Sequence, residues 1–328
     1  MGKETRAACE NILALAERRG LCASPTNRAE LNRFTYLRSK GELVTPYAGL
    51  FASAGVWSRL LPSQRTRRVM RTLARLHPSW IFVGPSAALV YYLAVPPSAM
   101  WPLCIATTGN GTCESYAHAI RRRVSPSDVL VINGMRTTSL DRAVVDCMRT
   151  LEFPSALAIA DSYLRKTNQP KERLEAMVAS PQMGKAGIRN ARLVASFSDG
   201  RAESWGESEA RAAIIELGFQ IPELQVPYQD PVTGKWYRAD FSWSLEGAPT
   251  VIGEMDGLLK YTDSSITGGD TVGAFVRERQ RESRLTIGGR SVMRFTPAQV
   301  KDRPYFERLL ESYGIPRGDP LAGWKARR

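Results

Sequence analysis

Residues 240–260 read DFSWSLEGAPTVIGEMDGLLK, and this stretch decides the fold that we predict for the second half of the chain. Side chains of a β-strand alternate between two faces, so VIGEMD would place Ile252, Glu254 and Asp256 on one face. Asp240 ends the preceding predicted strand, WYRAD, and antiparallel pairing would bring it beside Glu254. The stretch therefore predicts carboxylates gathered where the strands of a small sheet end.

The segments around this stretch predict a compact domain over residues 203–328. Their order is helix, three strands joined by turns, helix, strand and helix, or αβββαβα. Glu207 would enter from the first helix and Lys260 from the loop after the third strand. Carboxylates packed closely raise one another's pKa unless a cation lies between them. Oxygen ligands without Cys or His favour magnesium or manganese.

The charge of the chain is unevenly distributed. The 328 residues carry a net charge of +13. Residues 1–150 hold 20 Lys and Arg against 9 Asp and Glu, whereas residues 151–328 hold 25 against 23. A basic first half favours a module that binds phosphate groups of nucleic acid. The alternatives are a solvated basic surface or contact with an acidic partner protein.

Several classes of protein are disfavoured by composition. The five cysteines are scattered and form no CxxC pair, which argues against a disulfide framework or a zinc knuckle. His77 and His118 are the only histidines, so a multi-histidine metal site is excluded. No window approaches the roughly 20 apolar residues of a membrane span, and the N-terminus lacks a secretory signal pattern. We therefore expect a cytoplasmic protein with no membrane partner.

Residues 1–76 predict a winged helix-turn-helix domain that binds double-stranded DNA. A helix is followed by a basic helix and then by two extended pieces around a Pro-Tyr-Ala-Gly turn, which would form the wing. A third, arginine-rich helix, SQRTRRVMRTLARLH, would turn one cationic face toward phosphates. A helical packing domain without a DNA role is the alternative. The predicted DNA-binding residues of this region are Arg28, Asn32, Arg33, Arg38, Lys40, Arg68, Arg71 and Arg75.

The remaining segments complete a multidomain α/β protein. Residues 77–182 alternate short apolar strands with helices and predict a separate α/β domain. Asp161 lies on one of these helices, where an acid more often caps, pairs or faces water than catalyses. Residues 183–202 are small, polar and rich in glycine, which predicts a linker.

The C-terminal residues resemble the PD-(D/E)XK restriction-endonuclease-like superfamily, and within it the very-short-patch-repair-like branch. The first half resembles the AbiEi-type antitoxins of bacterial type IV toxin–antitoxin systems, through its winged-helix-like start and the segment INGMRTTSLDRAVVD. The superfamily pattern has a lysine two residues after the glutamate, where this chain has Asp256. The residues that carry the nuclease-like resemblance are Glu207 in AESWGES, Asp240 in YRADF, Glu254 and Asp256 in GEMDG, and Lys260 in LLKY.

The nuclease-like resemblance implies metal-dependent hydrolysis of phosphodiester bonds. Asp240, Glu254 and the carbonyl of Met255 would coordinate Mg²⁺ or Mn²⁺, which lowers the pKa of a bound water. Glu207 and Asp256 would complete the shell or hold a second ion. Lys260 would orient the water or balance charge on the phosphoryl oxygens. The residues predicted to grip the flanking DNA backbone are Arg277, Arg281 and Arg284.

Two functions are consistent with these predictions. The first is a DNA-binding protein whose C-terminal domain is a magnesium-dependent endonuclease. The alternative is a transcriptional repressor and antitoxin that binds its operator, and a cognate toxin protein, with a nuclease-like domain that does not cleave. Nothing in the residues separates DNA from RNA as the substrate of the nuclease-like domain.

Overall fold

The computed structural model describes residues 3–107, 119–180, 186–256, 284, 286 and 289–325. The chain forms two compact units, Met1–Asp146 and Cys147–Arg328. This division falls inside helix α6 (Leu140–Thr150), and not after residues 76 or 182 where we predicted boundaries. The overall class is the predicted one, a mixed α/β protein with several sheets.

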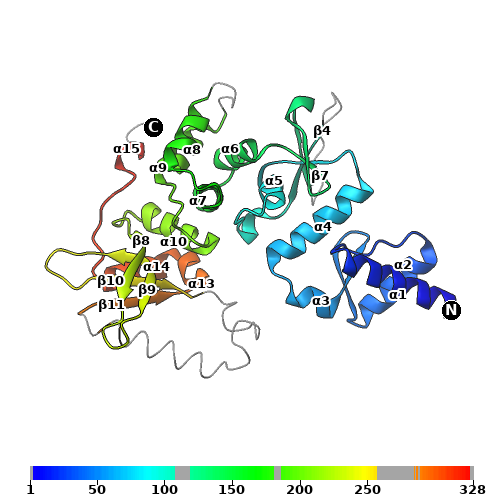
Figure 1. Ribbon diagram of the computed structural model, residues 1–328, viewed down its shortest axis with the longest axis horizontal. Coiled ribbons are helices and arrows are strands. Elements are labelled where there is room, and N and C mark those ends of the chain that lie inside the picture. Colours follow the sequence, from blue (N-terminus) through cyan, green and yellow to red (C-terminus); the bar gives the residue numbers. More distant parts are fainter. Residues whose placement is uncertain are drawn as a thin grey trace. The chain divides into compact units, whose positions relative to one another are not determined.

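The first unit begins with two helices and a hairpin (Figure 1). Asn27 caps α2, because its side chain accepts a hydrogen bond of 3.0 Å from the backbone N of Glu30. Phe34 of α2 packs against Phe51 of the hairpin with ring centroids 5.2 Å apart, in a core that α1 completes. The elements are α1 (Lys3–Arg18), α2 (Arg28–Ser39), β1 (Leu43–Tyr47), β2 (Leu50–Ser53), α3 (Ala54–Arg59) and α4 (Pro62–Leu76).

A five-stranded sheet follows in the same unit, with strand order β5-β4-β3-β7-β6. Strands β3 and β7 are parallel, as are β4 and β5, and the other two pairs are antiparallel. The helix that follows β3 is buried along its whole length, including Ser86. The elements are β3 (Ile81–Phe82), α5 (Gly84–Val90), β4 (Leu103–Thr107), β5 (Ala119–Arg123), β6 (Leu130–Ile132) and β7 (Met135–Thr137).

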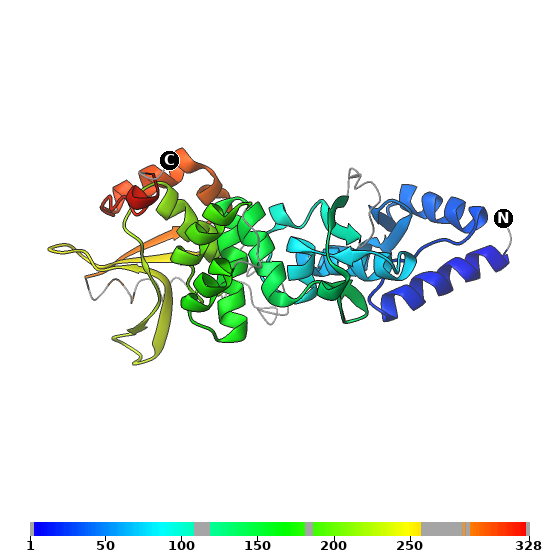
Figure 2. The ribbon, with the colours of Figure 1, turned by 90° about the horizontal axis from the view of Figure 1, so that it is seen from above.

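The second unit begins with a group of helices at one end of a sheet (Figure 2). The prediction of a linker over residues 183–202 is wrong for the described part, because it contains a helix with a buried face. Asn190 on this helix donates hydrogen bonds of 2.7 and 2.9 Å to the carbonyls of Met148 and Leu151. The helices are α7 (Phe153–Thr167), α8 (Lys171–Ala179), α9 (Ile188–Phe197) and α10 (Trp205–Glu216).

The sheet of the second unit has the order β11-β10-β9-β8. β8, β9 and β10 are antiparallel neighbours, and β11 lies parallel to β10. All four strands were predicted, whereas the last predicted helix divides in two at Asp302. The elements are β8 (Glu223–Gln229), β9 (Trp236–Trp243), β10 (Val251–Met255), β11 (Ser291–Phe295), α13 (Pro297–Lys301), α14 (Arg303–Ser312) and α15 (Ala322–Lys325).

The predicted alternation of β10 is confirmed by its packing. Val251 and Met255 lie in a core cluster with Phe241, together with residues from α10 and α14. Ile252 lies in a different cluster, with Ala239. Because both faces of β10 are covered, its residues are buried throughout, and the strand is held firmly at the centre of the sheet. None of the helices in the described ranges is long and apolar enough to cross a membrane.

Candidate functional site

Asp240 lies beside Glu254 and Met255, as antiparallel pairing of the strands predicts. The register of β9 and β10 pairs Ile252 with Ser242 and Gly253 with Phe241. The carboxylate of Asp240 then accepts a hydrogen bond of 2.9 Å from the backbone N of Met255. A side chain of β9 thus binds the end of β10, and the carboxylate is held at the point where β10 leaves the sheet.

The neighbouring strand is distorted at the same level. Leu224 pairs with Phe241 and Val226 pairs with Ala239, but Gln225 between them has a φ of 56°. A positive φ is uncommon for a residue other than glycine and marks a local departure from the regular ladder. The side-chain amide of Gln225 donates a hydrogen bond of 3.2 Å to the Oε2 atom of Glu207. The hydrogen bond from Gln225 therefore links the distorted part of β8 to the first turn of α10.

Glu207 is held at the first turn of α10. Ser204 caps the helix, and its hydroxyl donates a hydrogen bond of 2.8 Å to Oε1 of Glu207. The backbone N of Glu203 donates one of 2.8 Å to Oε2. Burial raises the pKa of the Glu207 carboxyl, and the negative charge of Asp240 raises this pKa further. The carboxylates of Glu207 and Asp240 therefore interact electrostatically at this end of the sheet.

Glu254 and Asp256 have different surroundings. Glu254 is buried on β10, where its register partner is Arg294 of β11. The carboxylate of Asp256 forms a two-point ion pair with the Arg294 guanidinium, with 3.0 Å between Nε and Oδ2. Arg294 therefore places a positive charge beside Asp256 from the next strand. Arg294 is not among the site residues predicted from the sequence.

We name Glu207, Asp240, Glu254 and Asp256 the acidic edge, and its oxygen donors fit a hard divalent cation in chemical type. The carboxylate of Glu207 already accepts bonds from α10 and β8, and Asp256 is paired with Arg294. Over the described ranges, no group of three or more His, Cys, Asp or Glu residues is placed to hold a metal ion. Asp240, Glu254 and Met255, which supply the predicted metal ligands, lie together at the end of β10, and Mg²⁺ commonly keeps several waters in its shell. Lys260 lies outside the described residues.

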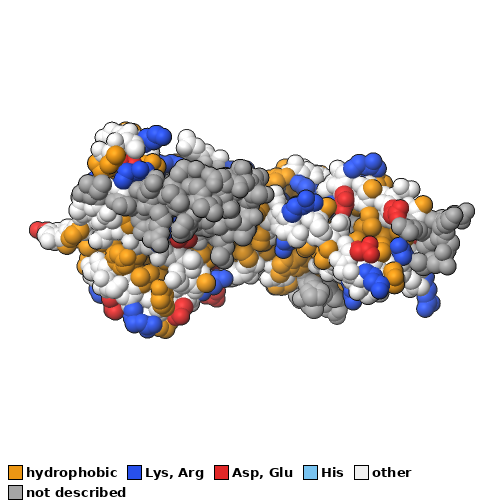
Figure 3. All heavy atoms as spheres, turned by 90° about the horizontal axis from the view of Figure 1, so that it is seen from below, with side chains coloured by type: hydrophobic (Ala, Val, Ile, Leu, Met, Phe, Trp, Pro, Cys, Tyr) orange, Lys and Arg blue, Asp and Glu red, His pale blue; other side chains and the backbone are white. Residues whose placement is uncertain are grey.

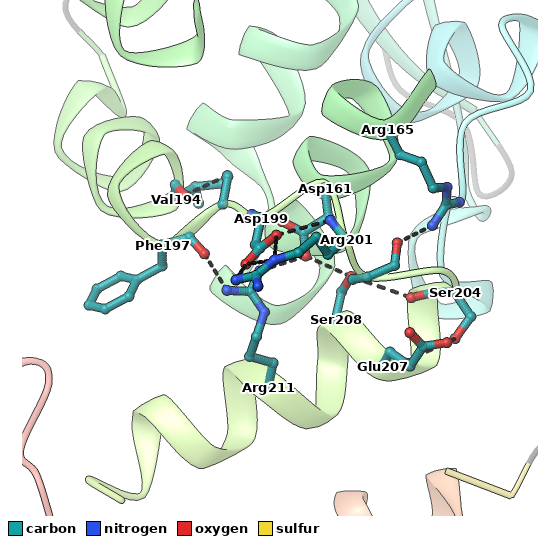
Figure 4. Close-up of polar contacts among 12 residues, drawn as sticks. Asp161, Arg165, Val194, Phe197, Asp199, Arg201, Ser204, Glu207, Ser208 and Arg211 are labelled. Carbon is teal, nitrogen blue, oxygen red and sulfur yellow. Dashed lines mark hydrogen bonds and ion pairs between the residues drawn. The ribbon is translucent and has the colours of Figure 1, made fainter. Parts of the chain in front are cut away.

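A buried polar network fixes the position of α10, which carries Glu207 (Figure 4). Asp161 of α7 is 1% exposed, and its Oδ2 atom accepts bonds of 2.8 Å from the Ser208 hydroxyl and 2.7 Å from the Arg211 guanidinium. Its Oδ1 atom accepts a bond of 2.7 Å from the backbone N of Asp199. Burial raises the pKa of Asp161, and the charge of Arg211 acts against this rise. Asp161 is thus one of the acids that pair, as expected for a helical position without a motif.

A pocket of about 520 Å³ opens beside this network and not at the acidic edge. Arg211 lines it, together with Asp199 and Arg201, which form an ion pair of 2.7 Å with each other. None of the four residues of the acidic edge contributes to its lining. Proximity of the acidic groups, rather than this pocket, therefore defines the candidate site.

The predicted DNA-binding residues on α2 and at its C-cap are mostly exposed. Arg28, Asn32, Arg38 and Lys40 are exposed to solvent, whereas Arg33 is half-buried with its guanidinium 5.4 Å from the centroid of the Tyr36 ring. On the face of the first unit seen in Figure 3, Lys and Arg side chains are interspersed with acidic and hydrophobic ones. This face carries many positive charges without forming one continuous basic patch.

The predicted phosphate-facing side of α4 is partly wrong. Arg68 is only 5% exposed, and its Nε atom donates a hydrogen bond of 2.8 Å to the carbonyl of Leu21. It therefore serves packing and is not available to a phosphate. Arg75 is exposed as predicted, while Arg71 donates a bond of 2.8 Å to the Tyr92 hydroxyl. Leu76, at the end of the helix, is 48% exposed.

The predicted DNA contacts of the second unit fall mainly outside the described residues. This holds for Arg277 and Arg281. Arg284 is described, and its Nε atom lies 2.8 Å from a carboxylate oxygen of Asp230, whose side chain is 1% exposed. An arginine engaged with a buried carboxylate is less available to a phosphate, so the structure gives Arg284 a role in holding the β8–β9 turn.

Comparisons with known proteins identify two relatives from Mycobacterium tuberculosis. They are the uncharacterized protein Rv2248 of strain H37Rv and the uncharacterized protein MT2308 of strain CDC 1551. Each is 40% identical to this chain over 112 residues, which is 34% of this chain. The match spans 41% of the length of each relative. No family model matches the chain, and no solved structure matches it.

Proposed function

We propose that the second unit is a magnesium- or manganese-dependent endonuclease of the PD-(D/E)XK type, and that the first unit binds the DNA it acts on. The observation that carries this proposal is the bond from Met255 N to Asp240 at the end of β10, with Glu254 adjacent and Glu207 within electrostatic reach. The mixed order β11-β10-β9-β8, preceded by α10, supports it.

Each residue of the acidic edge has a distinct task in this proposal. Asp240 and Glu254, with the carbonyl of Met255, would hold the cation, which when bound polarises the phosphate and acidifies a water. Glu207 is a positioning residue, because its carboxylate links α10 to β8 while its charge acts on Asp240. Arg294 neutralises Asp256 and so limits the negative charge that a phosphate would meet.

The first unit contributes DNA binding through α2 and the β1–β2 hairpin. α2 exposes Arg28, Asn32 and Arg38, its C-cap Lys40 is exposed as well, and the other side of the helix is packed against α1 and the hairpin. A single helix of this kind fits the major groove, with the hairpin beside it on the DNA backbone. Salt should weaken binding steeply, because each phosphate contact releases counterions.

A cleavage assay on plasmid and short duplex DNA, with Mg²⁺, Mn²⁺ or a chelator, tests the nuclease. Asp240→Asn should lower the cleavage rate by about 100-fold or more, because the amide oxygen is a weaker donor for a cation. Glu175→Gln is the matched control, since it removes an exposed carboxylate from α8. Equal cleavage by wild type and Asp240→Asn, or full activity in chelator, would contradict the proposal.

The engaged state of Glu207 and Asp256 favours a second candidate, a repressor and antitoxin that binds DNA without cutting it. In that case the wild-type chain would bind its operator with equal affinity in chelator and in Mg²⁺, and would leave the DNA intact. A nucleotidyltransferase-like toxin encoded beside it, neutralised in a growth assay by both wild type and Asp240→Asn, would support this candidate.

A further inference from the structure

Tyr92 has an unusual backbone conformation at the end of α5. Its φ is 60°, in the left-handed region. The backbone N of Leu93 donates to the carbonyl of Ala88 at 3.0 Å, which closes the helix end. Glycine usually occupies such a position, because the Cβ atom of an L residue is crowded there. Tyr92 is also 49% exposed, so burial of its ring does not account for the choice of residue.

Two arginines of α4 hold the Tyr92 side chain. The guanidinium of Arg67 lies 4.7 Å from the centroid of the ring. One turn later, Nη2 of Arg71 donates a hydrogen bond of 2.8 Å to the hydroxyl. The helices α4 and α5 are neighbours in the first unit (Figure 1). Tyr92 therefore contacts two guanidinium groups from positions i and i+4 of one helix, one at the face of its ring and one at its hydroxyl.

These two guanidinium groups differ from the arginines that pair with a carboxylate. Arg142, Arg211 and Arg294 each pair with a carboxylate. Arg67 and Arg71 have no carboxylate within ion-pair distance in the part of the chain that the structure describes. Burial lowers the pKa of Arg67, the neighbouring Tyr92 acts against this fall, and the positive charge of Arg71 adds to it. Two neighbouring positive charges repel each other, and an anion bound between them would relieve this repulsion.

We propose that Arg67, Arg71 and Tyr92 form a binding site for a phosphate group. Arg71 uses one of its five N–H donors on the Tyr92 hydroxyl, and Arg67 Nη2 lies 3.4 Å from the Ser63 hydroxyl, so each guanidinium keeps donors for phosphate oxygens. The planar fork of arginine matches a phosphate in a two-point arrangement. Tyr92 is a positioning residue that holds both forks in place.

The site is independent of the acidic edge, because all its residues belong to the first unit. The phosphate can come from a nucleic-acid backbone or from a small phosphate compound. Two measurements on the full chain separate these sources. The first is the rise in unfolding temperature with inorganic phosphate, at constant ionic strength. The second is the affinity for a short DNA duplex, measured at two salt concentrations in chelator.

The variants are Arg67→Gln, Arg71→Gln and Tyr92→Gly, with Arg59→Gln as the control. Arg59 is an exposed arginine of the same unit whose one hydrogen bond within the described residues is to the carbonyl of Gly55, so it corrects for the loss of one positive charge. Tyr92→Gly keeps the left-handed backbone without steric cost and removes only the ring. We expect each site variant to weaken binding about tenfold relative to the control. The slope of log affinity against log salt should fall by about one for each arginine variant.

Each outcome is decisive for the site. Loss of both the phosphate stabilisation and the duplex affinity assigns the site to a nucleic-acid phosphate. Loss of the phosphate stabilisation alone assigns it to a small phosphate compound. Loss of duplex affinity alone assigns it to a backbone phosphate that is bound only in a polymer. If all three variants match Arg59→Gln in both measurements while remaining folded, the proposal is wrong.

Discussion

Asp161, which contacts α10, and Glu207, which lies on α10, are both buried acids. Asp161 lies beside a positive charge, whereas Glu207 lies near a negative one. Asp161 meets the Arg211 guanidinium at 2.7 Å, and its remaining bonds come from Ser208 and the backbone of Asp199. Glu207 instead feels the negative charge of Asp240. The first arrangement is closed and holds α7 to α10. The second keeps like charges together at the end of β10, which is the arrangement that a cation would relieve.

The largest expected loss of stability comes from breaking the buried ion pair between Asp161 and Arg211. Arg211→Met should lower the free energy of unfolding by about 3–5 kcal/mol, because it leaves the carboxylate of Asp161 buried without its counter-charge. Urea denaturation followed by circular dichroism measures this loss. As the control, Arg201→Gln removes an arginine whose side chain is 59% exposed and should cost at most about 1 kcal/mol.

A double variant tests whether Asp161 and Arg211 stabilise the protein as a pair. Asp161→Leu combined with Arg211→Met removes both charges and should be less destabilising than the sum of the two single variants. Strict additivity would show that the two side chains act independently, and the account of Asp161 and Arg211 as one closed pair would then fail.

A smaller effect is expected at the acidic edge, where Asp256 pairs with Arg294. The side chains are 29% and 23% exposed, so solvent screens their attraction. Arg294→Gln should lower the free energy of unfolding by about 0.5–1 kcal/mol at low salt, and less at high salt. A loss as large as that of Arg211→Met would mean that the acidic edge is as closed as the Asp161 network.

The smallest effect concerns the pH dependence from Glu207. Its pKa is raised, so the folded protein keeps this proton to a higher pH than the unfolded chain does. Its contribution to stability is present at low pH and is lost as pH rises from the unfolded pKa through the folded one. The unfolding free energy of Glu207→Gln relative to wild type should therefore increase from acidic to neutral pH. A difference that stays constant over this range would contradict the raised pKa.

Local patterns were sufficient to predict the strands of the second unit and the approach of Asp240 to Glu254. Alternating apolar residues and turn signals are properties of neighbouring residues, and antiparallel pairing extends the register from them. The same reasoning failed for Arg68, because a helical pattern does not show that the Arg68 guanidinium will bond the carbonyl of Leu21, a residue distant in the sequence. It also failed for residues 186–202, whose small side chains allow α9 to pack closely rather than to act as a linker.

The positions of the strands, and the segment that brings acids to the end of a strand, follow from the amino-acid sequence alone, because periodicity and turn chemistry act over a few residues. Which charges are neutralised depends on the three-dimensional packing of the chain. Asp161 finds Arg211 50 residues away, Asp256 finds Arg294 38 residues away, and Tyr92 finds Arg71 21 residues away. The electrostatic environment of a side chain is set by groups brought close in space, so it follows from the packing of distant segments.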